Sequence, residues 1–132
     1  MSLMGGRPKL IRWEPDPAVD RPFVWVSIAK FDLAWSSDGL YIGPNGAGDD
    51  QPYKIERTKE WFARFDTSWM PQARLAQDGI PCFIDGRHRF VWVRENGARA
   101  IPVMIDPAFQ AEMQRRFGSR IRQCRVWPEA LG

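Results

Sequence analysis

The sequence has little of what a metal site, a disulfide framework or a membrane span requires. Among its 132 residues there are one histidine and two cysteines, Cys82 and Cys124, and there is no CxxC pair. Structural zinc sites draw their ligands mainly from these two residue types, so no metal site is expected. No apolar run reaches the roughly 18 residues of a membrane-spanning helix, and no membrane partner is expected. The first residues lack the layout of a secretory signal, so we expect reduced thiols and a cytoplasmic protein.

The length and composition favour one folded domain. A chain of 132 residues leaves little room for a second domain. Hydrophobic residues make up 44% and aromatic residues 13%, and seven Trp and eight Phe supply material for a packed core. We expect an extended N-terminal arm over residues 1–21 and a single domain over residues 22–132.

The net charge of +3 hides an asymmetry along the chain. Residues 1–66 carry nine basic and ten acidic side chains, whereas residues 67–132 carry ten and six. Every basic residue of the second half is an arginine, whose planar fork matches phosphate and carboxylate groups. An arginine-rich genome would produce the same bias. The asymmetry therefore favours a phosphate-bearing partner mildly and does not demonstrate one.

Alternating strand and helix signals predict a mixed α/β (α+β) fold. The β-branched and aromatic runs predict strands, the amphipathic runs predict helices, and Gly97 and Gly118 supply helix stops. The predicted strands cover residues 23–28, 70–76, 80–84 and 100–105, with an edge strand within 119–127, and the predicted helices cover 54–65, about 86–96 and 107–117. Residues 36–52 contain four glycines and two prolines and predict a long loop, a candidate lid.

The segment Asp85-Gly86-Arg87-His88-Arg89 is the strongest candidate for a functional site. It follows an apolar strand and opens a helix, where several backbone N–H groups lack partners and the helix dipole is positive. Gly86 would let the backbone approach a ligand, and the three basic side chains would add donors in the first turn. Such a turn is suited to holding a phosphate group.

Two residues of this turn have an ordinary structural interpretation beside the functional one. Asp85 fits a helix N-cap, and its alternatives are holding an arginine, contacting a ribose hydroxyl or binding Mg²⁺ with phosphate. A lone histidine is more often structural than catalytic, but the arginines beside His88 also favour ligand contact. Arg94 and Glu95, further along the helix, are interpreted as solvated charges.

The segments 83–90, 94–97 and 101–105 together resemble the ParB/sulfiredoxin-like superfamily. They read Phe-Ile-Asp-Gly-Arg-His-Arg-Phe, Arg-Glu-Asn-Gly and Ile-Pro-Val-Met-Ile, which follow its pattern of strand, Gly-x-His-Arg turn, helix, glycine and Pro-Val strand. The resemblance implies a compact domain with a small mixed sheet and about three helices. It also implies that the turn binds nucleotide phosphates, those of CTP in ParB proteins and of ATP in sulfiredoxins.

The departures from the superfamily pattern are informative. Sulfiredoxins carry their reactive cysteine where this chain has Arg87, so reduction of a sulfinic acid is not expected. ParB partition proteins carry a glutamate at Arg87, an arginine at Val91 and a Glu-Asn-x-x-Arg segment that residues 106–125 lack. No helix-turn-helix is expected to follow, so a DNA clamp gated by CTP is not expected either. The chain is most similar to small stand-alone members with an Asp-Gly-Arg-His-Arg turn.

The leading hypothesis is a binding or regulatory module for a nucleotide or another phosphate-bearing ligand. Arg87 and Arg89 would clamp the phosphates and His88 would orient them. If the ligand is a nucleoside triphosphate, Mg²⁺ would accompany it. Whether the protein is also an enzyme, and its oligomeric state, stay open.

Two alternative functions use other residues. A metal-dependent nuclease or phosphotransferase would need Asp85 to join a carboxylate cluster with Glu56, Glu60 or Asp66. A nucleic-acid-binding protein would use the basic C-terminal half, where Phe117 and Trp127 could stack on bases. The basic side chains in question are Arg115, Arg116, Arg120, Arg122 and Arg125.

Overall fold

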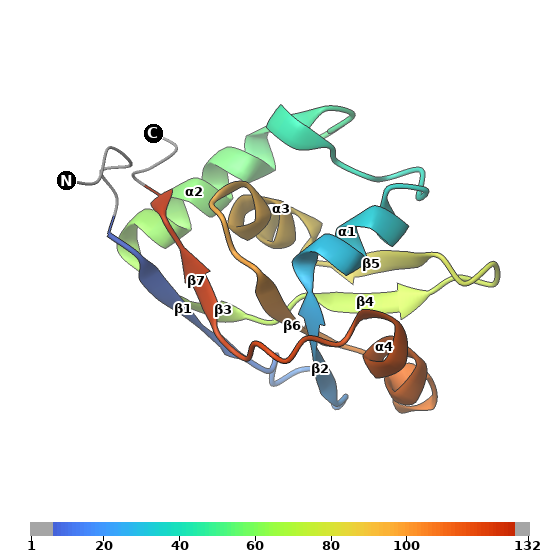
Figure 1. Cartoon of the computed structure of the whole chain (residues 1–132). Coiled ribbons are helices and arrows are strands. Elements are labelled where there is room, and N and C mark those ends of the chain that lie inside the picture. Colours follow the sequence, from blue (N-terminus) through green and yellow to red (C-terminus); the bar gives the residue numbers. More distant parts are fainter. Residues whose placement is uncertain (1–6, 129–132) are drawn as a thin grey trace.

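Two small β-sheets and four α-helices make up the part of the chain that the structure, a computed structural model, describes, residues 7–128 (Figure 1). In chain order the elements are β1 (Lys9–Glu14), β2 (Phe23–Ser27), α1 (Ile28–Trp35), a 3₁₀ turn (Pro44–Gly46), α2 (Tyr53–Arg64), β3 (Thr67–Trp69), β4 (Gln72–Leu75), β5 (Pro81–Asp85), α3 (Arg87–Glu95), β6 (Ala100–Met104), a 3₁₀ turn (Pro107–Phe109), α4 (Gln110–Phe117) and β7 (Cys124–Val126). The mixed α/β class predicted from the sequence is confirmed.

The larger sheet has the strand order β2-β6-β4-β5 and positions the turn at residue 86. β6 pairs antiparallel with β2 and parallel with β4, and β4 pairs antiparallel with β5. All five residues of β6 are buried, as its apolar sequence predicts for an interior strand. β5 is an edge strand, so the turn that follows it opens at the margin of the sheet.

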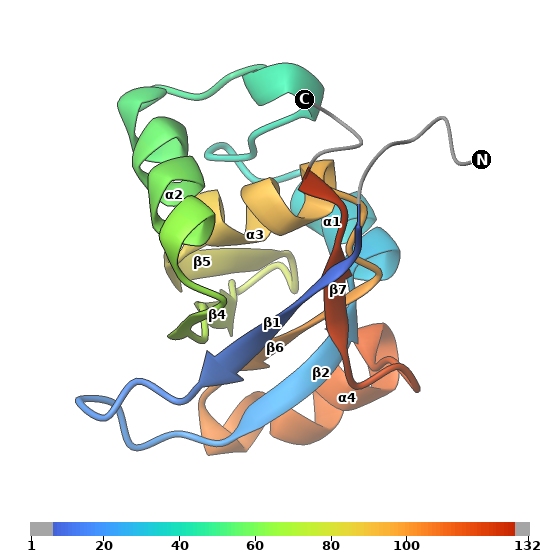
Figure 2. The ribbon, with the colours of Figure 1, turned by 90° about the vertical axis from the view of Figure 1, so that its left-hand side faces the viewer.

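The smaller sheet has the order β3-β1-β7 and ties the N-terminal segment to the rest of the molecule. Of the segment predicted as an extended arm, residues 1–6 lie outside the described residues, and residues 9–14 form the central strand β1. β1 pairs parallel with β3 and antiparallel with β7, which confirms an edge strand in the tail. Figure 2 shows β1 and β7 side by side across the front of the molecule.

Helix α1 and the short strand β3 are elements that the sequence analysis missed. The predicted strand at 23–28 ends at Ser27, whose hydroxyl accepts a hydrogen bond from the Lys30 backbone N–H and caps the helix. Ile28, Phe31 and Trp35 then face the core with helical spacing. The cap residue and this spacing were both readable in the sequence.

Aromatic side chains from distant elements form the centre of the core. The ring of Phe31 lies 5.3 Å from those of Phe83 and Phe90 and 5.6 Å from that of Phe117, measured between centroids. Edge-to-face and tilted contacts of this kind stabilise the fold beyond the contribution of the apolar area that the rings bury. A second contact, the stack of Phe62 on Trp92 at 4.6 Å, packs α2 against α3 and so fixes α2 beside the turn.

Neither cysteine forms a disulfide, and both are buried. Burial raises the pKa of the Cys82 thiol and raises that of the Cys124 thiol from 9.0 to about 12. None of the helices within residues 7–128 is long and apolar enough to cross a membrane.

The buried thiol of Cys124 makes stability depend on alkaline pH. Because its pKa is raised on folding, the neutral thiol stabilises the folded state fully below pH 9, and this contribution is lost as the pH rises toward 12. A Cys124→Ala variant should therefore show a shallower loss of unfolding free energy, by up to about 1 kcal/mol, between pH 9 and 10. Urea titrations at a series of pH values measure this. Parallel curves for the parent and the variant would contradict it.

Candidate functional site

Gly86 makes the turn between β5 and α3 and has a left-handed backbone, with φ of 91°. A Cβ atom built at this position would lie 2.8 Å from the Pro71 Cβ and 2.7 Å from Arg89 Nη2. The close approach that a glycine permits here is thus to Pro71 and Arg89 of the protein itself. The turn is therefore packed closely against Pro71 and Arg89, which leave no room for a side chain at residue 86.

Asp85 is not the N-cap of α3. It is the last residue of β5, Gly86 occupies the cap position, and no side chain caps the helix. The Asp85 carboxylate instead accepts a hydrogen bond of 3.0 Å from Arg89 Nη2. The N-cap interpretation was wrong because the strand continues one residue further than predicted, and the alternative of holding an arginine is what the structure shows.

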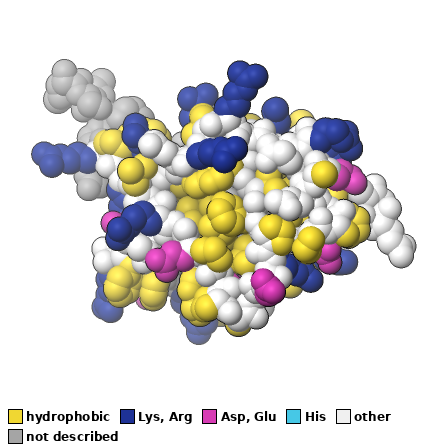
Figure 3. Space-filling view, turned by 90° about the horizontal axis from the view of Figure 1, so that it is seen from below, with side chains coloured by type: hydrophobic (Ala, Val, Ile, Leu, Met, Phe, Trp, Pro, Cys, Tyr) yellow, Lys and Arg dark blue, Asp and Glu magenta, His cyan; other side chains and the backbone are white. Residues whose placement is uncertain are grey.

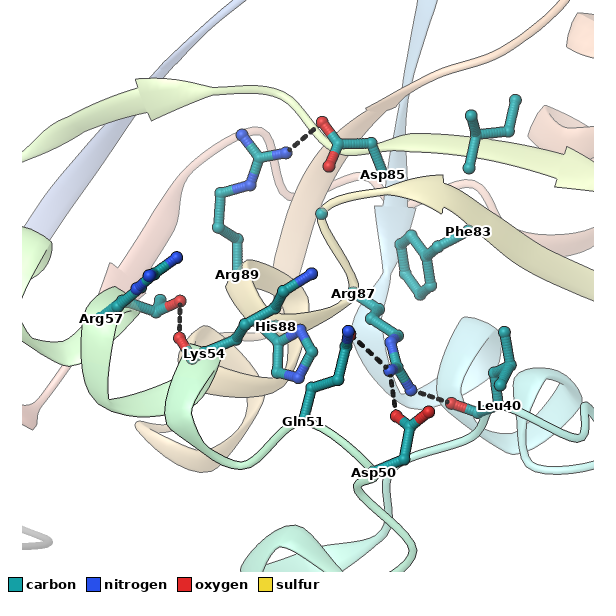
Figure 4. Close-up of a pocket in the computed structure, with 13 residues that line it drawn as sticks. Leu40, Asp50, Gln51, Lys54, Arg57, Phe83, Asp85, Arg87, His88 and Arg89 are labelled. Carbon is teal, nitrogen blue, oxygen red and sulfur yellow. Dashed lines mark hydrogen bonds and ion pairs between the residues drawn. The ribbon is translucent and has the colours of Figure 1, made fainter.

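Arg89 is fixed in two directions at the mouth of the turn. Besides its ion pair with Asp85, its Nη1 donates to the carbonyl oxygen of Trp69 at 2.9 Å. These two contacts hold the guanidinium beside the Asp85 carboxylate (Figure 4). A guanidinium already held in place loses less conformational entropy when it binds an anion.

Arg87 points to the loop of residues 36–52. Its guanidinium donates to the Leu40 carbonyl at 2.9 Å, to the Asp50 carboxylate at 2.5 Å and to the Gln51 amide oxygen at 3.3 Å. The hydrogen bond from Arg87 lowers the pKa of Asp50. The Arg87 side chain is 14% exposed, whereas that of Asp50 is 64% exposed.

His88 also contacts this loop. Its Nε2 lies 3.1 and 3.2 Å from the two carboxylate oxygens of Asp49. The His88 side chain is 9% exposed and that of Asp49 is 4% exposed, so the pair is shielded from solvent. This contact gives His88 a structural role; a part in orienting a ligand stays a prediction.

The five residues of the predicted turn line one open pocket of about 610 Å³. The rest of its wall comes from the loop, from α2 and from β5. The lining residues outside the turn are Leu40, Asp50, Gln51, Lys54, Arg57, Thr58, Phe83 and Ile84. Two parts of the chain that are distant in the sequence, the loop with α2 and β5 with α3, therefore meet at the pocket.

Lys54 and Arg57 are the site residues that the sequence analysis did not assign. Among the described residues neither side chain has an ion-pair partner, and the Arg57 guanidinium lies over the Tyr53 ring. Lys54 reaches from α2 toward the turn (Figure 4). Their spacing of three residues places them on one face of a helix, and this follows from the sequence. The sequence does not indicate that this face packs beside residue 86.

The loop of residues 36–52 is anchored to α3 by Arg94. This guanidinium donates to the Asp32 carboxylate at 2.9 Å and to the carbonyl oxygens of Ile42 and Gly43 at 2.6 and 3.0 Å. The neighbouring Glu95 carboxylate accepts from the Asn45 N–H at 2.8 Å. The interpretation of Arg94 and Glu95 as solvated charges was wrong, because the loop folds back over this part of α3.

The carboxylate cluster that a metal-dependent nuclease or phosphotransferase would need is not formed within residues 7–128. No group of three or more His, Cys, Asp or Glu side chains in this range is placed to hold a metal ion. Glu56 and Glu60 do not line the pocket; the α2 side chains that do are Lys54, Arg57 and Thr58. The sequence hypothesis required α2 to bring acids to Asp85, and α2 brings cations instead.

The C-terminal arginines do not share one arrangement. Arg116 pairs with Glu112 at 3.0 Å and donates to the Gly79 carbonyl, and it lies over the ring of Phe117. Phe117 is buried and so does not offer a face for stacking on a base. The other four arginines of this group are exposed. On the face seen in Figure 3, Lys and Arg side chains lie around a hydrophobic centre and do not form one continuous patch. Nucleic-acid binding here stays a prediction.

The fold and the pocket together define a mixed α/β domain with a cationic pocket at a strand-to-helix turn. A solved structure with a similar fold is that of the oncogenic suppression activity protein, a plasmid fertility inhibition factor. The two chains align with a TM-score of 0.55 at 20% identity, over 83% of this chain and 61% of the other, so this chain spans about three-fifths of that protein's length. At this identity the likeness concerns the fold alone. No family model and no curated protein sequence matches the chain.

Proposed function

We propose that this protein binds a phosphate-bearing ligand, such as a nucleotide, in the pocket at residues 85–89, and that it acts as a binding or regulatory module. The observation that carries the proposal is the convergence of four cationic side chains on one pocket. Lys54 and Arg57 come from α2, and Arg87 and Arg89 from α3. Among the described residues only two carboxylates, those of Asp50 and Asp85, line the same pocket, so the lining carries an excess of positive charge.

The backbone adds to this charge. The N-terminus of α3 opens into the pocket, and no side chain in the described part of the chain caps it. Its first N–H groups therefore keep their capacity to bind an anion, and the helix dipole favours negative charge there. A phosphate at this point would meet backbone donors and guanidinium forks together.

The dimensions and the remaining wall fit a small organic phosphate. A volume of about 610 Å³ lies within the usual range for small-molecule sites. Leu40 and Ile84 are half-exposed at the pocket, with Phe83 beside them. These apolar side chains offer a surface for a base or another apolar part of the ligand, and Leu40 and Phe83 lie across the pocket from Lys54 and Arg57 of α2 (Figure 4).

The resemblance to the ParB/sulfiredoxin-like superfamily supports the same site. In that superfamily the Gly-x-His-Arg turn is where nucleotide phosphates bind, and here the matching turn lines the cationic pocket. Membership of that superfamily, a cytoplasmic location and a nucleotide as the ligand are parts of this proposal. Arg87 at the position of the sulfiredoxin cysteine argues against thiol chemistry at the turn.

The proposal is tested by titrating pyrophosphate, ATP and CTP against the folded protein by calorimetry and thermal unfolding. A ligand present at 100 times its dissociation constant should stabilise the protein by about 2.7 kcal/mol. Replacing Lys54 by alanine should weaken binding about tenfold or more, because it removes a pocket cation that has no ion-pair partner within residues 7–128.

Lys59→Ala is the matched control for this change. Lys59 lies on the same helix, is exposed and does not line the pocket, so its loss removes the same charge with little effect on affinity. If none of the three phosphates shifts the unfolding curve, or if the two variants weaken binding equally, the pocket is not the phosphate site.

A further inference from the structure

We infer that the loop of residues 36–52 carries an internal competitor for the phosphate site: Asp50 occupies Arg87 in the free protein, and a bound phosphate takes its place. This inference rests on the proposed function and concerns the regulation of the same pocket. Its basis is that Arg87, a cation of the pocket wall, already holds a carboxylate from the loop.

The two partners of the Asp50–Arg87 contact differ in burial, and this difference makes Asp50 the partner that a phosphate displaces. The Arg87 guanidinium is largely covered and is also held by the Leu40 carbonyl and Gln51, so it stays in place. The Asp50 side chain is mostly in solvent, and Arg87 is the only side chain bonded to its carboxylate among the described residues. Exposed ion pairs contribute little net stability, so an arriving phosphate can displace this carboxylate.

The loop is built so that its Asp50 end can move while its other end stays fixed. Arg94 and Glu95 hold Ile42, Gly43 and Asn45 against α3, and Ile42 is fully buried. Beyond this anchor, Gly46 and Gly48 have φ of 79° and 80° and lie exposed. A short segment that includes two glycines absorbs backbone rotation at little steric cost, and it lies directly before Asp49 and Asp50.

Asp49 gives the loop a defined closed position. Its buried carboxylate contacts His88 in the turn, one residue from the Arg87 contact made by Asp50. Adjacent aspartates of the loop thus contact adjacent residues of the turn. When a phosphate replaces Asp50 at Arg87, one of these two neighbouring contacts is lost, and the segment of residues 46–52 is held less firmly.

The test compares pyrophosphate binding by the parent protein, Asp50→Asn and Glu60→Gln. The amide introduced by Asp50→Asn cannot offer a carboxylate to Arg87, so affinity should rise about three- to tenfold. Glu60→Gln removes one negative charge from an exposed position of α2 outside the pocket and should change affinity less than twofold. In the parent, saturating pyrophosphate should also speed amide hydrogen exchange in residues 46–52, whereas exchange in the buried strand β6 should slow, because ligand binding stabilises the folded protein as a whole.

The possible outcomes distinguish a failure of the competitor role of Asp50 from a failure of the proposed phosphate binding. If the parent binds pyrophosphate but Asp50→Asn binds with equal or lower affinity, the competitor role is wrong and the proposed function stands. If pyrophosphate slows exchange in residues 46–52, the loop closes on the ligand and displacement is also wrong. If the parent and Asp50→Asn are both folded and neither binds pyrophosphate, ATP or CTP, the proposed function fails and the competitor role fails with it.

Discussion

Replacing Arg94 by methionine is expected to lower the free energy of unfolding by about 3 kcal/mol. The Arg94 side chain is 9% exposed and donates to the Asp32 carboxylate and to two buried backbone carbonyls of the loop. Methionine keeps part of the apolar stem but leaves Asp32 Oδ1 and two carbonyl oxygens without the guanidinium donor, and of the side-chain hydrogen bonds to the Asp32 carboxylate only that from the Tyr41 hydroxyl remains among the described residues. Removing one partner of a largely buried ion pair is among the more damaging single changes a protein can undergo.

The measurement is a urea unfolding curve, with Arg99→Met as the control. Arg99 lies between α3 and β6, is exposed and forms no side-chain hydrogen bond with a described residue, so its replacement should change stability by no more than about 0.5 kcal/mol. The Arg94 variant should unfold at a lower urea concentration with a similar slope. Equal midpoints for the two variants would show that the Arg94 contacts do not hold the loop.

Replacing Gly86 by alanine is expected to cost about 2–4 kcal/mol of folding stability. Two separate penalties combine at this position. The left-handed backbone strains any residue with a Cβ atom, by about 1–2 kcal/mol. The new Cβ would also meet Pro71 and Arg89 at less than 3 Å, and the Pro71 backbone cannot move aside easily.

Gly79→Ala separates these two penalties. Gly79 in the β4–β5 hairpin has φ of 82°, and the nearest atom to a Cβ built there is 3.7 Å away. Its replacement therefore carries the backbone strain without the clash and should cost about 1–2 kcal/mol. Thermal or urea unfolding of both variants gives the difference, which is the cost of the clash. A smaller loss for Gly86→Ala than for Gly79→Ala would mean that the turn is not packed against Pro71.

The elements around the turn were predictable because their signals are local. The apolar run of β5, the glycine at residue 86 and the amphipathic segment with its stop at Gly97 all act within a few residues of one another. The strands β4 and β6 and the helices α2 and α4 were found in the same way. Helix α1 was missed although Ser27 and the spacing of Ile28, Phe31 and Trp35 carried the same kind of signal.

The N-terminal strand shows where local signals end. Residues 9–14 were identified as extended, but an extended segment becomes a strand only when neighbours accept its hydrogen bonds. Those neighbours, β3 and β7, lie more than 50 and more than 100 residues away in the sequence. No sequence pattern within residues 7–21 identifies β3 and β7 as the partners of this strand.

The charges of the site depended most on the tertiary structure. Arginines that the sequence presented as free phosphate ligands are held by Asp50, Asp85 and backbone carbonyls. Lys54 and Arg57, which the sequence placed only within a predicted helix, are pocket cations that have no ion-pair partner among the described residues. An ion pair forms between groups that the fold brings within a few ångströms, whatever their separation along the chain.

The sequence by itself determined the mixed α/β class and the strand, glycine turn and helix at residues 80–97. It did so because backbone preferences and hydrophobic periodicity act between near neighbours. Only the tertiary structure decided that the loop of residues 36–52 contacts Arg87, His88 and Arg94, and that α2 supplies cations rather than carboxylates to the pocket. The sequence separation between the partners in these loop contacts ranges from 36 positions, for Gln51 and Arg87, to 52 positions, for Ile42 and Arg94. Contacts over such separations follow from packing, which no local pattern encodes.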